Sequence, residues 1–91
     1  MLNKVKLALQ ISTNTFDSEL NDLIEAAKID LGIAGVTLPA ELDTIVERAI
    51  TSYCCYQFEL EHGDGSKSDR LKRAYDEQKA QLSMATGYTT W

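Results

Sequence analysis

The sequence has few residues of the kinds that build metal centres, thiol active sites or membrane spans. Its 91 residues include two cysteines, one histidine, one proline and one tryptophan. A structural zinc site usually takes four Cys or His ligands, and the chain has only three such residues. No apolar stretch approaches the ~18 residues that a transmembrane helix needs, and the N-terminal segment lacks the cleavage site of a signal peptide. We therefore expect an intracellular protein in a reducing compartment, with no membrane contact, metal or cofactor.

Basic residues are also scarce over most of the chain. Residues 1–65 hold four Lys/Arg against eleven Asp/Glu, whereas residues 66–91 hold five against three. Duplex DNA is bound by basic patches, so the acidic body argues against a DNA-binding protein. An acidic body with a mildly basic end fits a molecule whose one end contacts the other end of a second copy. The same balance also fits solvated faces without a partner.

Apolar residues recur at helical spacing in four segments, and no segment alternates as a strand does. The pattern predicts an all-α bundle with helices at about 2–11, 16–33, 39–61 and 67–83. We expect residues 1–83 to form one helical domain and residues 84–91 an irregular C-terminal tail. The predicted core stripe of the third helix comprises Leu42, Ile45, Val46, Ala49, Ile50, Tyr53, Gln57 and Leu60.

The third helix also carries the two adjacent cysteines, followed by the histidine. Neighbouring residues on a helix diverge by about a quarter turn, so Cys54 and Cys55 cannot hold one metal ion together. Helical geometry does not offer them a disulfide either. A nucleophile made of a cysteine and His62 would lack any group to orient it. We therefore expect buried or half-buried free thiols, no catalytic residue and no metal ligand.

Between Tyr53 and Phe58 the third helix is apolar around most of its circumference. Cys55 and Phe58 are expected to lie away from the Tyr53 side, and a helix that is apolar all round is either central or covered by a neighbour. This outward strip predicts a contact surface. Together with acidic residues of the second and third helices and basic residues of the last, it gives a candidate subunit interface of Cys55, Phe58, Asp22, Glu25, Glu41, Glu47, Lys67, Arg70 and Arg73.

Other motifs give no site. The glycines at 63–65 lack the spacing and the lysine of a phosphate-binding loop. The helices around Gly32 and Gly35 could suggest a helix-turn-helix, but their linker is long and the second helix begins with the acidic LPAELD.

Two alternative functions stay open. One is a small helical DNA-binding regulator or antitoxin-like protein, which needs a basic reading surface. The other is a small enzyme or metal protein, which needs a set of ligand residues.

Four groups of residues follow one another along the chain with a characteristic order and spacing. They are Val5, Lys6 and Leu9; then Asp17, Glu19, Leu20, Leu23, Ile24 and Ala27; then Arg48, Ala49, Ile50, Tyr53 and Phe58; then Tyr75, Asp76, Lys79, Leu82 and Ser83, with Tyr88 beyond. In this respect nearly the whole chain resembles the small head–tail connector (adaptor) proteins of long-tailed phages, especially those that infect Gram-positive hosts.

The resemblance implies a structural virion protein without catalytic residues. By this resemblance, copies of the protein form a ring beneath the portal, and the ring is dodecameric in the virion. The ring extends the DNA channel and docks neck or tail proteins. DNA would pass through without sequence-specific binding. The protein would be found at the head–tail junction of the virion, after assembly in the host cytoplasm. The resemblance also implies that the C-terminal segment reaches the portal or neck, with Tyr88 and Trp91 as candidate contacts. The alternative is a frayed terminus without a role.

Overall fold

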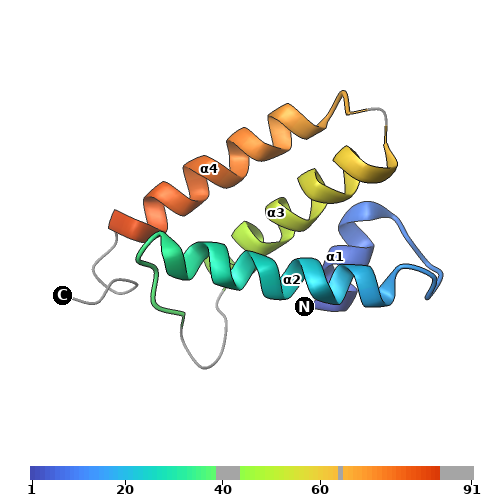
Figure 1. Cartoon of the computed structure of the whole chain (residues 1–91), viewed down its shortest axis with the longest axis horizontal. Coiled ribbons are helices and arrows are strands. Elements are labelled where there is room, and N and C mark those ends of the chain that lie inside the picture. Colours follow the sequence, from blue (N-terminus) through green and yellow to red (C-terminus); the bar gives the residue numbers. More distant parts are fainter. Residues whose placement is uncertain (39–43, 64, 85–91) are drawn as a thin grey trace.

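The computed structural model describes residues 1–38, 44–63 and 65–84, which form four helices and no β-strand (Figure 1). The helices are α1 (Leu2–Leu9), α2 (Asp17–Ile33), α3 (Thr44–His62) and α4 (Ser68–Met84). The predicted all-α bundle is confirmed, with most helix bounds within two residues of the prediction. The predicted start of the third helix at residue 39, Glu41, and residues 85–91 of the predicted tail lie outside the described residues.

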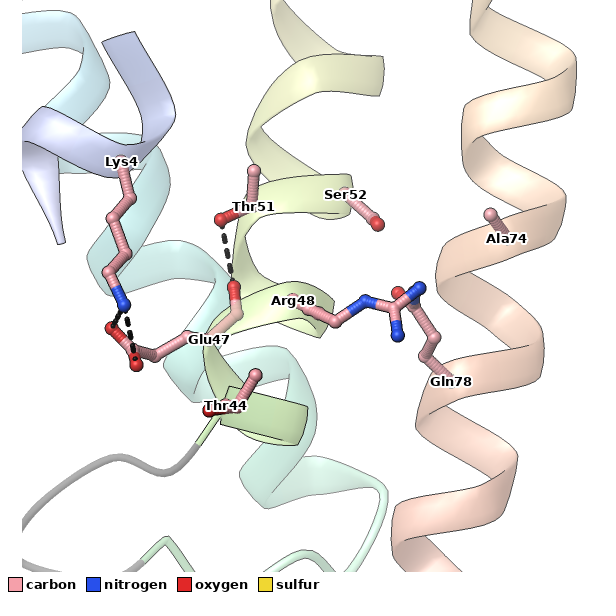
Figure 2. Close-up of a pocket in the computed structure, with 8 residues that line it drawn as sticks. All are labelled: Lys4, Thr44, Glu47, Arg48, Thr51, Ser52, Ala74 and Gln78. Carbon is pink, nitrogen blue, oxygen red and sulfur yellow. Dashed lines mark hydrogen bonds and ion pairs between the residues drawn. The ribbon is translucent and has the colours of Figure 1, made fainter. Parts of the chain in front are cut away.

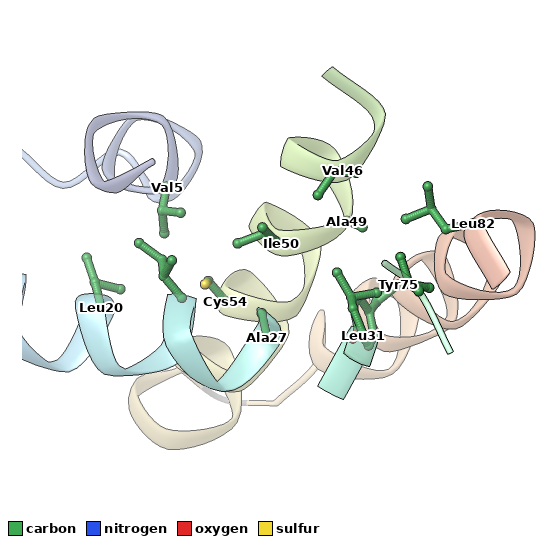
Figure 3. Close-up of a cluster of buried hydrophobic side chains, with 12 residues drawn as sticks. Val5, Leu20, Ala27, Leu31, Val46, Ala49, Ile50, Cys54, Tyr75 and Leu82 are labelled. Carbon is green, nitrogen blue, oxygen red and sulfur yellow. The ribbon is translucent and has the colours of Figure 1, made fainter. Parts of the chain in front are cut away.

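α3 lies at the centre of the bundle, and α1, α2 and α4 all pack against it. α3 and α4 form an antiparallel pair, and α2 also runs opposite to α3 (Figure 1). Every helix contributes to one buried apolar cluster (Figure 3). Its members are Val5 of α1, Leu20, Ile24, Ala27 and Leu31 of α2, Val36 after α2, Val46, Ala49, Ile50 and Cys54 of α3, and Tyr75 and Leu82 of α4.

Two residues of the predicted α3 core stripe are exposed instead. Ile45 is 53% exposed and Leu60 is 61% exposed. They lie in the first and last turns of α3, where the neighbouring helices do not cover them. Helical periodicity fixes the direction of a side chain but not how far a neighbouring helix extends.

α1 ends earlier than predicted because Gln10 adopts the left-handed conformation, with φ 58°. The backbone N–H of Gln10 donates to the carbonyl of Leu7, and that of Ile11 donates to the carbonyl of Lys6. These bonds satisfy carbonyls that the helix end would otherwise leave unpaired. The chain then turns toward α2, and Lys6 forms an ion pair of 2.9 Å with Asp17 in the first turn of that helix.

The turn between α3 and α4 is stabilised by the side chain of Ser68, the first residue of α4. Ser68 is buried and donates its hydroxyl to the carbonyl oxygen of Tyr56 at 3.2 Å. Gly65 has φ 80°, a conformation that glycine adopts without strain. The bond from Ser68 therefore ties the start of α4 to α3.

Candidate assembly surfaces

The side of α3 that points away from the core is flanked by α1 and α4 and carries two hollows. The α3 residues on this side include Glu47, Thr51, Cys55 and Glu59, which recur every four residues and so form one stripe of the helix. Two hollows follow this stripe. We call the two hollows together the α3 groove.

The larger hollow of the α3 groove, about 450 Å³, lies over the first half of α3 (Figure 2). Arg48 extends from α3 toward Gln78 of α4, and α2 passes behind α3 in this view. Lys4 of α1 closes another edge through an ion pair of 2.9 Å with Glu47. The lining residues are Lys4, Thr44, Glu47, Arg48, Thr51, Ser52, Ala74 and Gln78.

The smaller hollow, about 230 Å³, lies over the second half of α3. Leu9 of α1 and Leu71 of α4 bring apolar surface to it, and Lys67 and Glu59 bring charges of opposite sign. The lining residues are Ala8, Leu9, Gln10, Cys55, Glu59, Lys67 and Leu71. The larger hollow therefore exposes mainly the carbon atoms of polar side chains and of Ala74, whereas the smaller hollow mixes apolar and charged side chains.

Several basic side chains in and beside the α3 groove are free to meet a partner. Arg48 and Lys67 line the groove, and Arg70 and Arg73 lie on the exposed side of α4. All four are exposed, and none forms an ion pair with another described residue. By contrast, two carboxylates that the sequence assigned to an acidic contact patch are already paired, Glu47 with Lys4 and Glu25 with Lys28.

The outer face of α2 differs in chemistry from the α3 groove. It consists of Asp22, Glu25, Ile29 and Ile33, which share one stripe of the helix opposite its buried stripe. Ile29 is 64% exposed and Ile33 is 81% exposed. The carboxylates occupy the first half of the helix and the isoleucines the second. Sequence reasoning selected the two carboxylates but missed the isoleucines, although their spacing to Asp22 and Glu25 would have shown the shared face.

Cys55 lies on the outward side of α3 but is buried there within its own chain. Cys55 is 8% exposed and Cys54 is fully buried, and both are free thiols. Cys55 does point away from the core, but α1 and α4 cover it from both sides at the floor of the smaller hollow. Burial raises the pKa of Cys54 to about 12 and that of Cys55 to about 11. Both thiols therefore stay protonated and unreactive at neutral pH.

Phe58, the other residue of the predicted strip, packs within its own chain. Its ring meets that of Phe16 edge-on at 5.2 Å between centroids and lies 4.5 Å from the ring of His62. His62 in turn places Nε2 2.7 Å from a carboxylate oxygen of Glu19 in α2. This aromatic cluster joins the end of α3 to the start of α2, and Phe58 is half-buried within it.

Glu19, Glu61 and His62 can bring one potential metal-ligand atom each within 4.8 Å of one another. Sequence reasoning missed this cluster because it looked for cysteine and histidine partners only. Glu61 and His62 are exposed, and acidic groups beside an exposed histidine are common without a metal. The contact that the structure supports is the pair between His62 and Glu19.

A second polar cluster ties α4 to α2. Tyr75 is 1% exposed and donates its hydroxyl to the carboxylate of Asp30 at 2.5 Å. Lys79 lies 3.2 Å from the same oxygen and 5.1 Å from the centre of the Tyr75 ring. Burial alone would raise the pKa of Asp30, but the hydrogen bonds from Tyr75 and Lys79 and the charge of Lys79 outweigh it and lower that pKa. Burial and the bond to Asp30 raise the pKa of Tyr75.

The structure thus separates the predicted interface residues onto different surfaces. Asp22 and Glu25 lie on the outer face of α2, whereas Lys67 lies in the α3 groove with Arg70 and Arg73 beyond it. Glu41, Tyr88 and Trp91 fall outside the described residues. None of the described helices combines the length and apolar character needed to cross a membrane.

The features described so far define a small all-α protein with two unlike exposed faces and two buried, unreactive thiols. A family model described as phage connector protein matches residues 1–89, so the chain belongs to the phage connector family. This family is structural and not enzymatic, and its members are virion components that assemble with portal and tail proteins. Neither the curated proteins nor the solved structures gave a match.

Proposed function

We propose that this protein is the head–tail connector subunit that forms a closed ring beneath the portal vertex of a long-tailed phage, extends the DNA channel and docks neck or tail proteins. The observation that carries the proposal is the family match, which spans residues 1–89 of 91. The ring is dodecameric in the virion, and the phage infects a Gram-positive host, as the resemblance in sequence implies. Assembly takes place in the host cytoplasm.

The charge of the chain suits passage of DNA without retention. The net charge is −5, and a channel wall of the same sign as the phosphate backbone repels it. The exposed cations of the described residues lie mainly on α4 and along the α3 groove, where a protein partner can cover them. DNA passes through the ring without sequence-specific binding.

The contact with the portal or neck is assigned to the C-terminal residues. Tyr88 and Trp91 are aromatic residues of the kind that anchor protein interfaces. They follow α4 by only a few residues, so they can reach beyond the end of the bundle while α4 stays packed on α3.

The proposal is tested by the mass and shape of the assembled protein and by its place in the particle. We expect multi-angle light scattering and native mass spectrometry of the purified chain, alone or with portal protein, to give a large oligomer. Negative-stain images should show rings, and antibodies should label the head–tail junction of virions. A stable dimer that shifts a DNA probe and is missing from virions would favour the DNA-binding regulator and overturn the proposal.

A further inference from the structure

We infer that neighbouring subunits join by seating the outer face of α2 of one copy in the α3 groove of the next copy. The inference rests on the proposed function, because it names the surfaces through which the proposed ring closes. A closed ring needs a heterologous interface, in which a patch on each subunit meets a different patch on its neighbour. The structure carries two such patches.

The two patches lie on opposite sides of the molecule. The buried stripe of α2 packs against α3, so the outer face of α2 points away from α3. The α3 groove lies on the side of α3 away from α2, with α2 behind it in Figure 2. Copies that follow one another around a ring in the same orientation therefore present the outer face of α2 to the groove of the neighbour.

The direction of the helices fixes which parts of the two patches meet. Glu19 near the start of α2 pairs with His62 at the end of α3, and Asp30 near the end of α2 pairs with Lys79 in the second half of α4. The acidic half of the outer face therefore lies at the same end of the molecule as the smaller hollow. The isoleucine half lies at the same end as the larger hollow.

In that register the chemistry of the two patches is complementary. Asp22, which forms no ion pair among the described residues, and Glu25, whose only ion pair is a surface contact with Lys28, approach Lys67 and Arg70 of the neighbour. Lys67 and Arg70 have no ion-pair partner among the described residues of their own chain. Ile29 and Ile33, spaced by one helical turn, form a ridge that fits over the larger hollow of about 450 Å³. The exposed isoleucines lose their water contact there, and apolar burial contributes more to affinity than surface ion pairs do.

Two kinds of variant test the two patches independently of each other. Ile29→Glu with Ile33→Glu removes the α2 ridge and leaves the α3 groove intact. Ala74→Glu places a charge in the larger hollow and leaves the outer face of α2 intact. Leu60→Glu is the matched control, because Leu60 is 61% exposed and lies on neither patch. All substituted positions are exposed or line a hollow, so circular dichroism and thermal melts should match those of the wild-type protein.

We expect the isoleucine variant and the Ala74→Glu variant each to stay monomeric where wild-type and Leu60→Glu proteins form rings, with affinity lowered by more than roughly tenfold. Mixed in equal amounts, the two variants should form a dimer and nothing larger, because one intact α2 face meets one intact groove and no further contact can form. A double variant Ile29→Cys with Ala74→Cys should give a ladder of disulfide-linked oligomers on mild oxidation, and either single substitution should not.

Rings formed by the isoleucine variant, or no dimer in the mixture, would overturn the inference while leaving the proposed ring in place. Failure of the wild-type chain to form any oligomer, with or without portal protein, would instead overturn the proposed function. If Ala74→Glu does not fold, Ser52→Glu replaces it, since Ser52 lines the same hollow from α3.

Discussion

The hydroxyl of Tyr75 donates a hydrogen bond of 2.5 Å to the carboxylate of Asp30, 45 residues earlier in the chain. Tyr75→Phe removes the hydroxyl and keeps the ring in the core. We expect it to lower the free energy of unfolding by about 1.5–3 kcal/mol, the usual range for a hydrogen bond to a charged group. Urea denaturation of the two proteins measures the difference, and an unchanged midpoint would show that the bond contributes nothing.

Acid should weaken the same cluster. The pKa of Asp30 is lowered from its ordinary value of 3.8, so the unfolded state takes up the proton first as the pH falls. The stability that the ionised carboxylate supplies is therefore complete above pH 3.8 and is lost as the pH falls through the lower pKa of the folded state. Thermal melts between pH 6 and pH 2 should show a smaller loss for Asp30→Asn than for the wild-type protein. Equal losses would contradict the assignment.

The two cysteines should behave as protected thiols. Because burial raises the pKa of both, alkylation by iodoacetamide at pH 7.5 should be slow in the folded protein and rapid at both sites in urea. Replacing both with alanine should cost about 1–2 kcal/mol of stability through lost packing and leave assembly intact. Stoichiometric zinc in the purified protein, or unfolding by a chelator, would contradict this account.

Phe58→Glu should destabilise the domain. The sequence alone predicts folded monomers from this change, because it places Phe58 on an outward strip. Packing of Phe58 on Phe16 instead predicts a loss of about 2 kcal/mol or more in the free energy of unfolding. Thermal melts decide between the two: an unchanged melting temperature with lost assembly would restore Phe58 to the subunit interface.

Charge reversal on α4 should weaken assembly in a way that depends on salt. Arg70→Glu and Arg73→Glu change exposed residues without an ion-pair partner among the described residues, so the fold should be unaffected. Surface ion pairs are worth only ~0–1 kcal/mol each and are screened by salt. Light scattering at low and high salt should show the largest difference from wild type at low salt. A difference that does not change with salt would contradict an electrostatic role.

Removal of residues 85–91 should leave the bundle folded and abolish binding to portal protein. α4 ends at Met84, so the deletion does not shorten a described helix. Trp91→Ala and Tyr88→Ala should each weaken a pull-down with portal protein, because aromatic anchors carry much of an interface's affinity. Unchanged portal binding by the deletion variant would leave these residues without a role.

Helical periodicity was sufficient to predict the four helices and most of the core, because each buried stripe recurs every three or four residues. It could not predict that α1 and α4 leave a groove between them over Cys55, since that depends on how neighbouring helices sit on α3. It also missed Asp30, whose partners Tyr75 and Lys79 are far away in sequence. The family could be predicted because the order and spacing of the helix motifs can be read directly from the sequence. The Gram-positive host stays a prediction.

The three ties Lys4–Glu47, Glu19–His62 and Asp30–Tyr75 each join residues separated by 43 to 45 positions. In each pair, the partner in the second half of the chain therefore leaves the ribosome seconds after the first, because synthesis proceeds at about 5–20 residues per second. The α3–α4 hairpin needs only short loop closure, whereas α1 and α2 contact each other but lack their packing against α3 until it has emerged. We therefore expect the bundle to fold after synthesis and in one cooperative step, and subunits to reach the growing phage neck already folded.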